Sequence, residues 1–146
     1  MRVEFTVPGE PRGKGRPRFA RKGGFVYTDH KTKDYENIVK AAYRMVYGDY
    51  QFPQEASLLL FVTAYFKIPK STSKRKADLM RKGVIRPTKT PDWDNIGKII
   101  ADGCNKLIWD DDSHVIQGTV EKYYSDDPRV DVVVLDMEEY EKWLDG

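Results

Sequence analysis

The chain is organised around one stretch, Pro91-Asp92-Trp93-Asp94-Asn95-Ile96-Gly97-Lys98. Its two aspartates stand directly before an apolar repeat that is typical of a helix. The charge of the chain changes sign here. Residues 1–91 carry 20 Lys and Arg against 8 Asp and Glu, whereas residues 92–146 carry 5 against 15. The net charge of +2 therefore hides a strong asymmetry, which indicates a polyanionic partner for the basic part.

The bulk composition is that of one globular domain. A length of 146 residues predicts a single domain, 1–146, and 40% hydrophobic residues are enough for an ordinary core. The single cysteine, Cys104, excludes an internal disulfide, fits a reducing setting and lies in an apolar pattern typical of a packing residue. No apolar run approaches the ~18 residues of a membrane span, and the start lacks a signal peptide. We expect a soluble, cytoplasmic protein that does not associate with a membrane.

Hydrophobic periodicity predicts strands alternating with helices. The expected strands are 2–7, 56–68, 114–124 and 129–135, and the expected helices are 28–47, 73–82, 94–106 and 137–144. This order predicts an α/β (α+β) fold, a single compact domain with a mixed β-sheet and helices packed on it. The last two strands flank a turn at 126–128 and are expected to pair as a hairpin. Residues 9–24, rich in Gly and Pro, predict an open loop.

Two of the predicted helices have a clear apolar face. In the helix 28–47 the three- and four-residue spacing predicts one buried stripe of Tyr35, Ile38, Val39, Ala42, Met45 and Val46. In the helix 94–106 it predicts a buried face of Ile96, Ile99, Ile100, Gly103 and Leu107. Asp94 or Asn95 is expected to cap this second helix, so the motif lies at a helix start.

Carboxylates near this helix suggest a metal site. Mg²⁺ commonly takes one or two carboxylates together with phosphate oxygens and water, and Asp92 and Asp94 can supply these. A third comes from Asp110, Asp111 or Asp112 if the chain folds back, since like charges in an ordered corner repel unless a cation lies among them. Two plainer interpretations stay open: Asp94 is only an N-cap, and the acidic triplet is a solvated loop. The presence of two carboxylate clusters in one short chain favours the metal site over these interpretations.

Lys98 lies four residues after Asp94 and shares its helix face. It forms an exposed ion pair with a carboxylate, or it contacts a phosphoryl group whose charge it offsets, and we favour the second. Asp102, four residues further, is expected to be structural. A calcium-binding EF-hand loop is excluded because its fifth position is Ile96 and its twelfth is Gly103. The chain also lacks a Gly-rich phosphate loop and a Cys or His cluster for zinc.

Cations gather in two segments that precede the carboxylates. The first is the loop with Lys14, Arg16, Arg18, Arg21 and Lys22. The second runs through Lys70, Lys74, Arg75, Lys76, Arg81, Lys82, Arg86 and Lys89. Such side chains reach backbone phosphates and position a nucleic acid without selecting its sequence. A flexible solvated loop is the alternative, and clustering beside the carboxylates favours a phosphate-binding track.

These motifs together resemble those of a known family. The pattern is Pro91-Asp92-x-Asp94-Asn95-x-x-Lys98-x-x-x-Asp102-Gly103, then Trp109-x-Asp111-Asp112-Ser113-x-Val115, with the loop Gly13-Lys14-Gly15-Arg16-Pro17-Arg18. It resembles the RusA family of Holliday junction resolvases of bacteria and phages. The resemblance implies a homodimeric, Mg²⁺-dependent endonuclease, with Mn²⁺ as a substitute, that cuts four-way junction DNA by paired symmetric incisions in recombination and repair. No small-molecule cofactor is implied.

The resemblance also implies roles for individual residues. Asp92, Asp94 and Asp112 would be the metal-binding catalytic carboxylates and Lys98 the catalytic lysine. Asp111 is the adjacent acid, and because Asp110 makes a triplet where the family has a pair, the third ligand could shift by one residue. The expected DNA contacts are Lys14, Arg16, Arg18, Arg21, Lys74, Arg75, Lys76, Arg86 and Lys89. Two rival functions stay open: a non-catalytic DNA-binding module, and a metal-dependent nuclease acting on flaps or other branched DNA.

Overall fold

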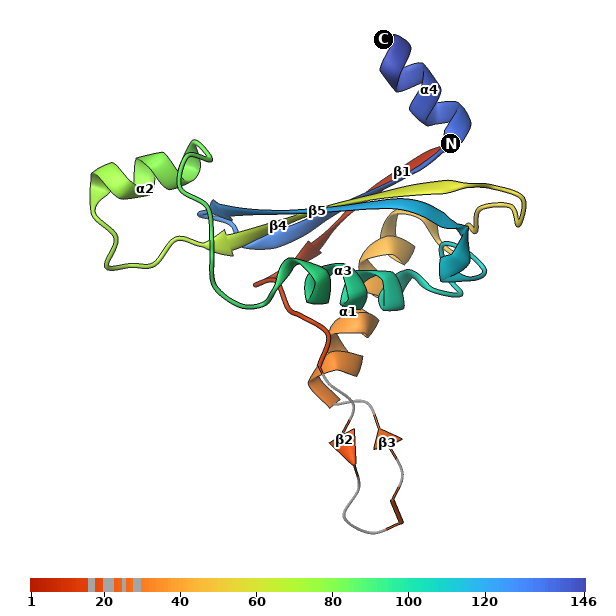
Figure 1. Cartoon of the computed structure of the whole chain (residues 1–146), viewed down its shortest axis with the longest axis horizontal. Coiled ribbons are helices and arrows are strands. Elements are labelled where there is room, and N and C mark those ends of the chain that lie inside the picture. The colour runs from red at the N-terminus through yellow and green to blue at the C-terminus, as the bar shows by residue number, and fades with distance from the viewer. Residues whose placement is uncertain (16–17, 20–22, 25, 28–29) are drawn as a thin grey trace.

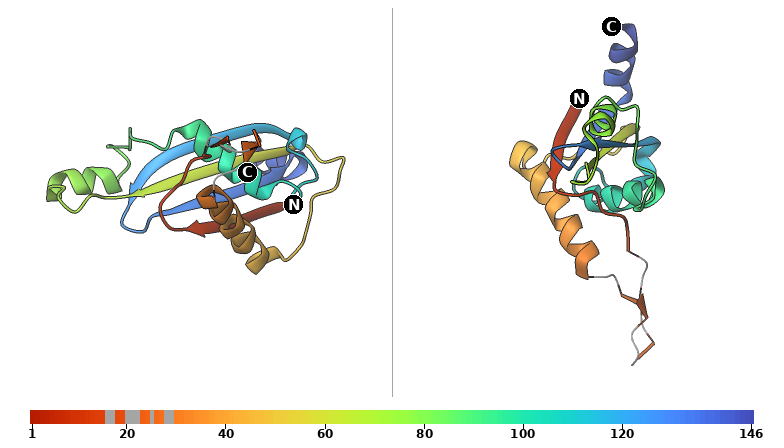
Figure 2. Two further views of the ribbon diagram at one scale, coloured as in Figure 1. Left: turned by 90° about the horizontal axis from the view of Figure 1, so that it is seen from below. Right: turned by 90° about the vertical axis from the view of Figure 1, so that its left-hand side faces the viewer.

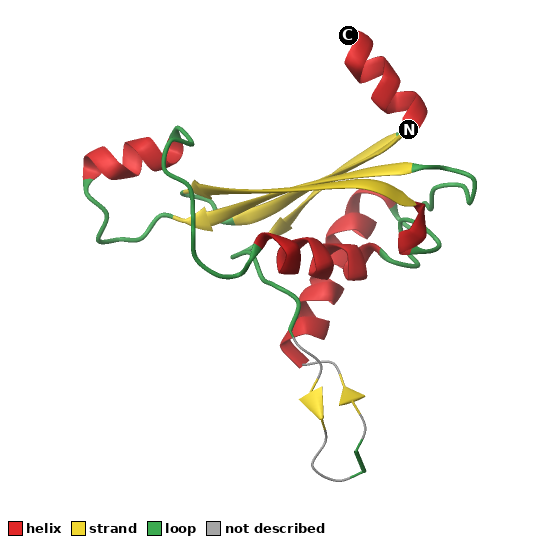
Figure 3. Cartoon of the chain, viewed as in Figure 1, coloured by secondary structure: helices red, strands yellow, loops and turns green. Residues whose placement is uncertain are grey.

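A four-stranded mixed sheet with helices packed on it forms the framework (Figures 1 and 3). This computed structural model describes residues 1–15, 18–19, 23–24, 26–27 and 30–146, with the backbone alone for 18–19 and 26–27. The sheet strands are β1 (Arg2–Pro8), β4 (Leu58–Lys67), β5 (Val115–Ser125) and β6 (Arg129–Asp136). The helices are α1 (His30–Tyr47), α2 (Lys74–Arg81), α3 (Trp93–Cys104) and α4 (Met137–Asp145), with a 3₁₀ turn η1 (Asp112–His114). The predicted fold class is confirmed.

The strand order, β1-β6-β4-β5, differs from the expectation at one point. The predicted hairpin between the last two strands is wrong, because β4 lies between β5 and β6 and pairs with both. β4 is the most apolar strand. At the centre of the sheet it has a paired strand on each edge. It runs parallel to β5 and antiparallel to β6. A parallel pair needs a long crossover, and the segment containing α2 and α3 supplies it.

The core lies between the sheet and the helices α1 and α3, which cover one face (Figure 2). α3 crosses α1 closely at Gly103, where a Cβ atom would lie 2.9 Å from the Cβ of Val39. Only glycine allows this approach without displacing one helix. The fully buried side chains include Val3, Val7, Tyr43, Leu58, Phe66, Ile96, Ile99, Ile100, Ile108 and Trp109. The position of α3 is thereby fixed relative to both α1 and the sheet.

The buried stripe of α1 is narrower than predicted. Thr32, Tyr35, Val39 and Tyr43 are buried, so Tyr35 and Val39 are confirmed and Ala42 is partly buried. The expected burial of Ile38, Met45 and Val46 is wrong, since all three are exposed. These residues flank the stripe that faces the sheet. They line an apolar groove of about 590 Å³ between β1 and α1, together with Phe5, Thr6, Pro8, Ala41 and Ala42.

The predicted open loop at 9–24 contains one short strand that the sequence did not predict, β2. β2 (Arg18–Phe19) pairs antiparallel with β3 (Val26–Tyr27) and extends from the body of the chain (Figure 1). The predicted caps at 28 and 29 lie outside the described residues. α1 begins at His30 in the part of the chain that the structure describes. Within that part, no helix has both the length and the apolar character that crossing a membrane requires.

Candidate nucleic-acid and metal site

The start of α3 presents the two aspartates of the central motif. The N-cap is Asp92, so the expected cap at Asp94 or Asn95 is wrong, and Asp94 lies in the first turn. The backbone carbonyl of Asp92 accepts a hydrogen bond from Ile96 N at 3.0 Å, but its carboxylate makes no capping hydrogen bond. An N-cap aspartate ordinarily uses its carboxylate for this purpose. Both carboxylates are exposed, so they are available to a ligand.

The loop at 11–15 is attached to the same helix start. Lys14 N donates to the carbonyl of Asn95 at 3.0 Å, and Gly15 N donates to Thr32 Oγ1 at 3.2 Å. Between loop and helix lies a pocket of about 400 Å³. It is lined by Pro11, Arg12, Gly13, Lys14, Gly15, Lys31, Thr32, Thr90, Pro91, Asn95 and Ile99. A cationic pocket therefore adjoins the carboxylates, at a helix start whose dipole also favours an anion.

Gly13 allows the loop to lie this close to the helix. A Cβ atom on Gly13 would lie 2.8 Å from the Cβ of Pro91 and 3.1 Å from the Cβ of Asn95, and neither of these atoms can rotate out of the way. We expect Gly13→Ala to push the loop away, break the Lys14–Asn95 hydrogen bond and weaken DNA binding. Electrophoretic mobility shifts with junction DNA measure this. Gly118→Ala, on β5 with open space around the added atom and no positive φ, controls for the effect of adding a methyl group elsewhere.

An ion network ties the loop to α1 and α3. Lys14 Nζ lies 2.8 Å from Glu36 Oε1 and 2.9 Å from Asp102 Oδ2, and Asp102 Oδ1 lies 3.1 Å from Lys98 Nζ. Burial alone would lower the pKa of Lys14, but the hydrogen bonds to Glu36 and Asp102 outweigh it and raise the pKa. Asp102 thus bridges two lysines. Lys14, predicted to contact DNA, anchors the loop in this structure, while Lys98 is exposed one turn after Asp94.

The acidic corner lies at the other end of α3. Trp109 Nε1 donates to Asp112 Oδ1 at 2.8 Å, and the carboxylate of Asp111 caps η1 by accepting from Ser113 N at 3.1 Å. Hydrogen bonding to Ser113 lowers the pKa of Asp111. The side chain of Asp112 is close enough to buried Cys104 to add to the rise in the thiol pKa that burial causes. Both acids therefore lie near the C-terminal end of α3.

The structure does not bring the two acidic clusters together. The 12 residues of α3 separate them, which at about 1.5 Å per residue is roughly 18 Å. Within residues 1–15 and 30–146 and the short described pieces between them, no group of three or more His, Cys, Asp or Glu could hold a metal ion. The expected folding back of the 110–112 corner onto Asp92 and Asp94 is therefore not seen in the single chain.

The remaining predicted DNA contacts fall into three groups. Lys74, Arg75 and Lys76 are exposed on the first turn of α2, at the same end of the sheet as the start of α3 (Figure 1). In the linker, Arg86 Nε donates to the carbonyl of Lys122 at 2.8 Å, and Lys89 Nζ lies 5.8 Å from the centre of the Phe66 ring. Arg16 and Arg21 lie outside the described residues, as does the side chain of Arg18.

Four residues of the site were not singled out from the sequence. Arg12 and Lys31 line the pocket, Thr32 accepts from the loop, and Glu36 pairs with Lys14. The one signal for Glu36 is its spacing, four residues after Thr32 on the same face of a predicted helix. Arg12 and Lys31 had no distinguishing pattern in a generally basic segment.

Comparison with known proteins gives two matches. Residues 8–135 match the protein family described as Endodeoxyribonuclease RusA. The chain is also 36% identical over 142 residues to the uncharacterized protein YqaN of Bacillus subtilis (strain 168), covering 90% of this chain and 94% of the relative. The family match includes the α3 start, the ion network and the acidic corner.

Proposed function

Because the chain belongs to the RusA endodeoxyribonuclease family, we propose that it is a Mg²⁺-dependent endonuclease that resolves Holliday junctions by paired symmetric hydrolysis of phosphodiester bonds. Its place would be DNA recombination and repair in a bacterial or phage-infected cell. The observation that carries the proposal is the pair of exposed carboxylates at the α3 start, beside a pocket lined by cations. Carboxylates for a metal and cations for phosphates are the two requirements of metal-assisted phosphodiester cleavage.

Asp92 and Asp94 fit the needs of Mg²⁺. This ion is usually held by one or two carboxylates, with substrate phosphates and water completing an octahedron, so two protein ligands suffice. The absence of a three-carboxylate group among the described residues is compatible with that mode. When bound, such an ion activates water and offsets charge on the phosphate, and Mn²⁺ would serve in its place. The unused capping position of Asp92 keeps its carboxylate available for this role.

Lys98 and the pocket would act on the DNA itself. The exposed ammonium of Lys98 lies one turn beyond Asp94, oriented by Asp102, and would steady negative charge on the phosphoryl group. Asp102 in turn is held by Lys14, so the network positions Lys98. Arg12 and Lys31 would hold a neighbouring backbone phosphate in the pocket.

Asp112 is a separate part of the proposal. The family resemblance assigns it to the metal, with Asp111 as the adjacent acid. In this structure its carboxylate is held by the indole of Trp109 one helix length from Asp92. A ligand role for Asp112 therefore requires a 110–112 corner, of this chain or of a second copy, to lie at the start of α3. Asp112→Asn is the matched variant that tests it.

DNA binding would come from the basic segments that precede α3. We expect replacing Lys74, Arg75 and Lys76 together by Gln to weaken junction binding about equally for all sequences, because phosphate contacts carry no sequence information. The slope of log affinity against log salt should fall by about 0.9 for each phosphate that the protein no longer neutralises. Titrations by fluorescence anisotropy at several salt concentrations measure both effects. An unchanged slope would show that α2 does not bind the DNA backbone.

A lysine far from α2 offers a control for that experiment. Lys142 on α4 is exposed and far from α2 along the fold, and it pairs with Glu138 on its own helix at 3.5 Å. Lys142→Gln removes one positive charge and leaves the proposed track intact. We expect its salt slope to equal that of the wild type.

A panel of labelled substrates tests the proposed activity. Four-way junction, flap and linear duplex DNA of the same sequence are incubated with Mg²⁺, and the products are mapped on a denaturing gel. The proposal expects symmetric incisions in opposite strands of the junction and little cleavage of the others. Cleavage of flaps in preference to junctions would assign a different branched substrate. Binding without incision in Mg²⁺ or Mn²⁺ would instead indicate an architectural module.

A further inference from the structure

A buried hydroxyl on α1 lacks a hydrogen-bond partner. Tyr35 is only 3% exposed, and its phenolic oxygen has no partner among the residues that the structure describes. A buried polar group in this state costs free energy, so such groups usually meet a protein partner, a water molecule or a ligand. Burial raises the pKa of Tyr35 to about 12, and the positive charge of nearby Arg12 opposes this rise. The hydroxyl is therefore a neutral O–H donor near pH 7.

Tyr35 lines a small pocket between α1 and the loop at 11–15. The volume of this pocket is about 170 Å³, and its other lining residues are Arg12, Lys31, Asp34 and Ile38. A water molecule takes about 30 Å³ in the liquid, so the pocket has room for a larger polar group. Two cations and one acid line it, and the carboxylate of that acid, Asp34, lies 3.2 Å from His30 Nε2. The lining therefore favours an anion that accepts hydrogen bonds.

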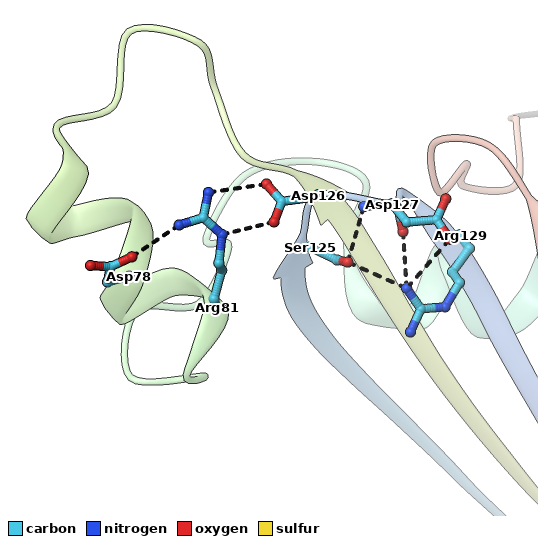
Figure 4. A network of polar contacts seen from close by, with 6 residues as sticks. All are labelled: Asp78, Arg81, Ser125, Asp126, Asp127 and Arg129. Atoms are coloured by element: carbon cyan, nitrogen blue, oxygen red, sulfur yellow. Dashed lines mark hydrogen bonds and ion pairs between the residues drawn. The ribbon is translucent and has the colours of Figure 1, made fainter.

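The guanidinium of Arg12 differs from those at the end of the sheet in its partners. Figure 4 shows the usual arrangement, in which Arg81 binds Asp126 through Nε and Nη2 at 2.7 and 3.2 Å. Arg129 is likewise held, with Nη1 donating to the carbonyl of Asp127 at 3.0 Å. No carboxylate pairs with Arg12 in the part of the chain that the structure describes, and its side chain is exposed. Its donors are therefore available to a phosphate, which a guanidinium binds through two parallel hydrogen bonds.

The small pocket is continuous with the larger pocket at the α3 start. Arg12 and Lys31 line both of them. The larger pocket adjoins the carboxylates of Asp92 and Asp94, the proposed metal ligands. A DNA strand that lies in the larger pocket can therefore place one phosphate at the carboxylates and another between the two cations. There the hydroxyl of Tyr35 is a third donor.

We propose that the small pocket is a phosphate site, in which Tyr35 and Arg12 bind one backbone phosphate of the strand to be cut and so set the register of that strand at the metal site. The phosphate oxygens accept hydrogen bonds from the phenol and the guanidinium, and Lys31 adds positive charge. A phosphate held at a fixed place determines which neighbouring phosphodiester reaches the carboxylates, because cleavage depends on exact positioning of the reacting bond. The inference rests on the proposed function and names the residues that select the bond.

Methylphosphonate substitution tests the site directly. Each phosphate near the crossover of a four-way junction is replaced in turn by an uncharged methylphosphonate, and affinity is measured by fluorescence anisotropy with a chelator present. We expect one position where the replacement weakens binding to the wild type about tenfold, the size of one hydrogen bond to a charged group. Tyr35→Phe and Arg12→Gln should each bind the unmodified junction about tenfold more weakly.

The combination of protein and DNA changes identifies the phosphate. At the sensitive position the two variants should show no further loss, because the contact that the methylphosphonate removes is already missing. A wild type without a sensitive position, or equal losses in all three proteins at every position, would overturn the proposal.

Thermal unfolding separates phosphate binding from a structural role of the hydroxyl. Tyr35→Phe removes a group that has no partner among the described residues, so its unfolding temperature should equal or exceed that of the wild type. Tyr43→Phe is the matched control on the same helix, since the Tyr43 hydroxyl donates to the carbonyl of Tyr50 at 2.6 Å. This control should unfold at a lower temperature and keep wild-type affinity for DNA. A less stable Tyr35→Phe with wild-type affinity would overturn the proposal.

The positions of the incisions report the register. In Mg²⁺, Tyr35→Phe and Arg12→Gln should spread the incisions over neighbouring phosphates. Arg44→Gln is the matched charge control, because Arg44 lies in the last turn of α1 and pairs with Asp49 at 3.2 Å. It should keep the wild-type pattern. A wild-type pattern in both site variants would overturn the proposal.

The binding measurement is independent of cleavage, since it needs neither metal nor turnover. A wild type that fails to cut junctions but shows the sensitive phosphate would overturn the proposed function and leave the phosphate site standing. Normal cleavage together with wild-type affinity of Tyr35→Phe and Arg12→Gln would do the reverse.

Discussion

Asp92→Asn is expected to abolish cleavage of junction DNA while leaving junction binding intact. The carboxylate is exposed at the α3 N-cap and makes no capping hydrogen bond, so its loss should remove the proposed metal ligand with little cost to the helix. Changes in residues that merely support metal ligands lower affinity or activity by about 10- to 100-fold, and loss of a ligand should exceed that range. Single-turnover cleavage rates and anisotropy titrations with the same junction measure the two effects separately.

The matched controls make this prediction specific. Asp49→Asn removes an exposed carboxylate just after the end of α1, away from the α3 start, and should cleave at the wild-type rate. Asp94→Asn should behave as Asp92→Asn does. If Asp112→Asn also loses cleavage with intact binding, an acidic corner, of this chain or of a second copy, must lie at the α3 start during cleavage. Wild-type cleavage by Asp92→Asn in Mg²⁺ would show that this carboxylate does not hold the catalytic ion.

Trp109→Ala is expected to cost about 3–5 kcal/mol of the free energy of unfolding, the usual range for removing a buried tryptophan. Trp109 is only 1% exposed and lies in the core that joins α3 to the sheet. The change leaves a cavity and also removes the hydrogen bond from Nε1 to Asp112. Urea unfolding followed by circular dichroism measures the loss without depending on tryptophan fluorescence.

Trp93 provides the control at the start of α3. It is 64% exposed at the first residue of that helix, so Trp93→Ala removes a side chain of the same kind without opening a cavity. Surface changes of this sort usually alter stability by less than about 0.5 kcal/mol. Similar losses for Trp93→Ala and Trp109→Ala would contradict the assignment of Trp109 to the core.

Local patterns predicted the elements well because each follows from a short period. The alternation at 2–7 and the apolar spacing through Ile96, Ile99 and Ile100 correspond to β1 and α3 with small changes at their ends. Strand order is not a local property. The turn after Ser125 suggested a hairpin, but the apolar β4 gains two neighbours by inserting between β5 and β6, and that gain is tertiary.

The residues of the candidate site could be named from the sequence, but their arrangement could not. The motif located the carboxylates of Asp92 and Asp94 and the cations beside them. The separation of Asp112 could have been inferred, since an unbroken helix between the clusters is rigid and keeps its two ends apart. The pairing of Lys14 with Glu36 and Asp102 could not, because it depends on how the loop crosses α1 and α3.

Cleavage of a four-way junction extruded in a supercoiled plasmid tests the central claim most directly. Two incisions within one binding event convert the plasmid to a linear form, whereas independent incisions give a nicked circle first. With Mg²⁺ present, this protein should yield linear product with symmetric ends at the junction, and a chelator should leave the plasmid supercoiled. Plasmid that stays supercoiled with both Mg²⁺ and Mn²⁺, although the protein binds the junction, would contradict the account.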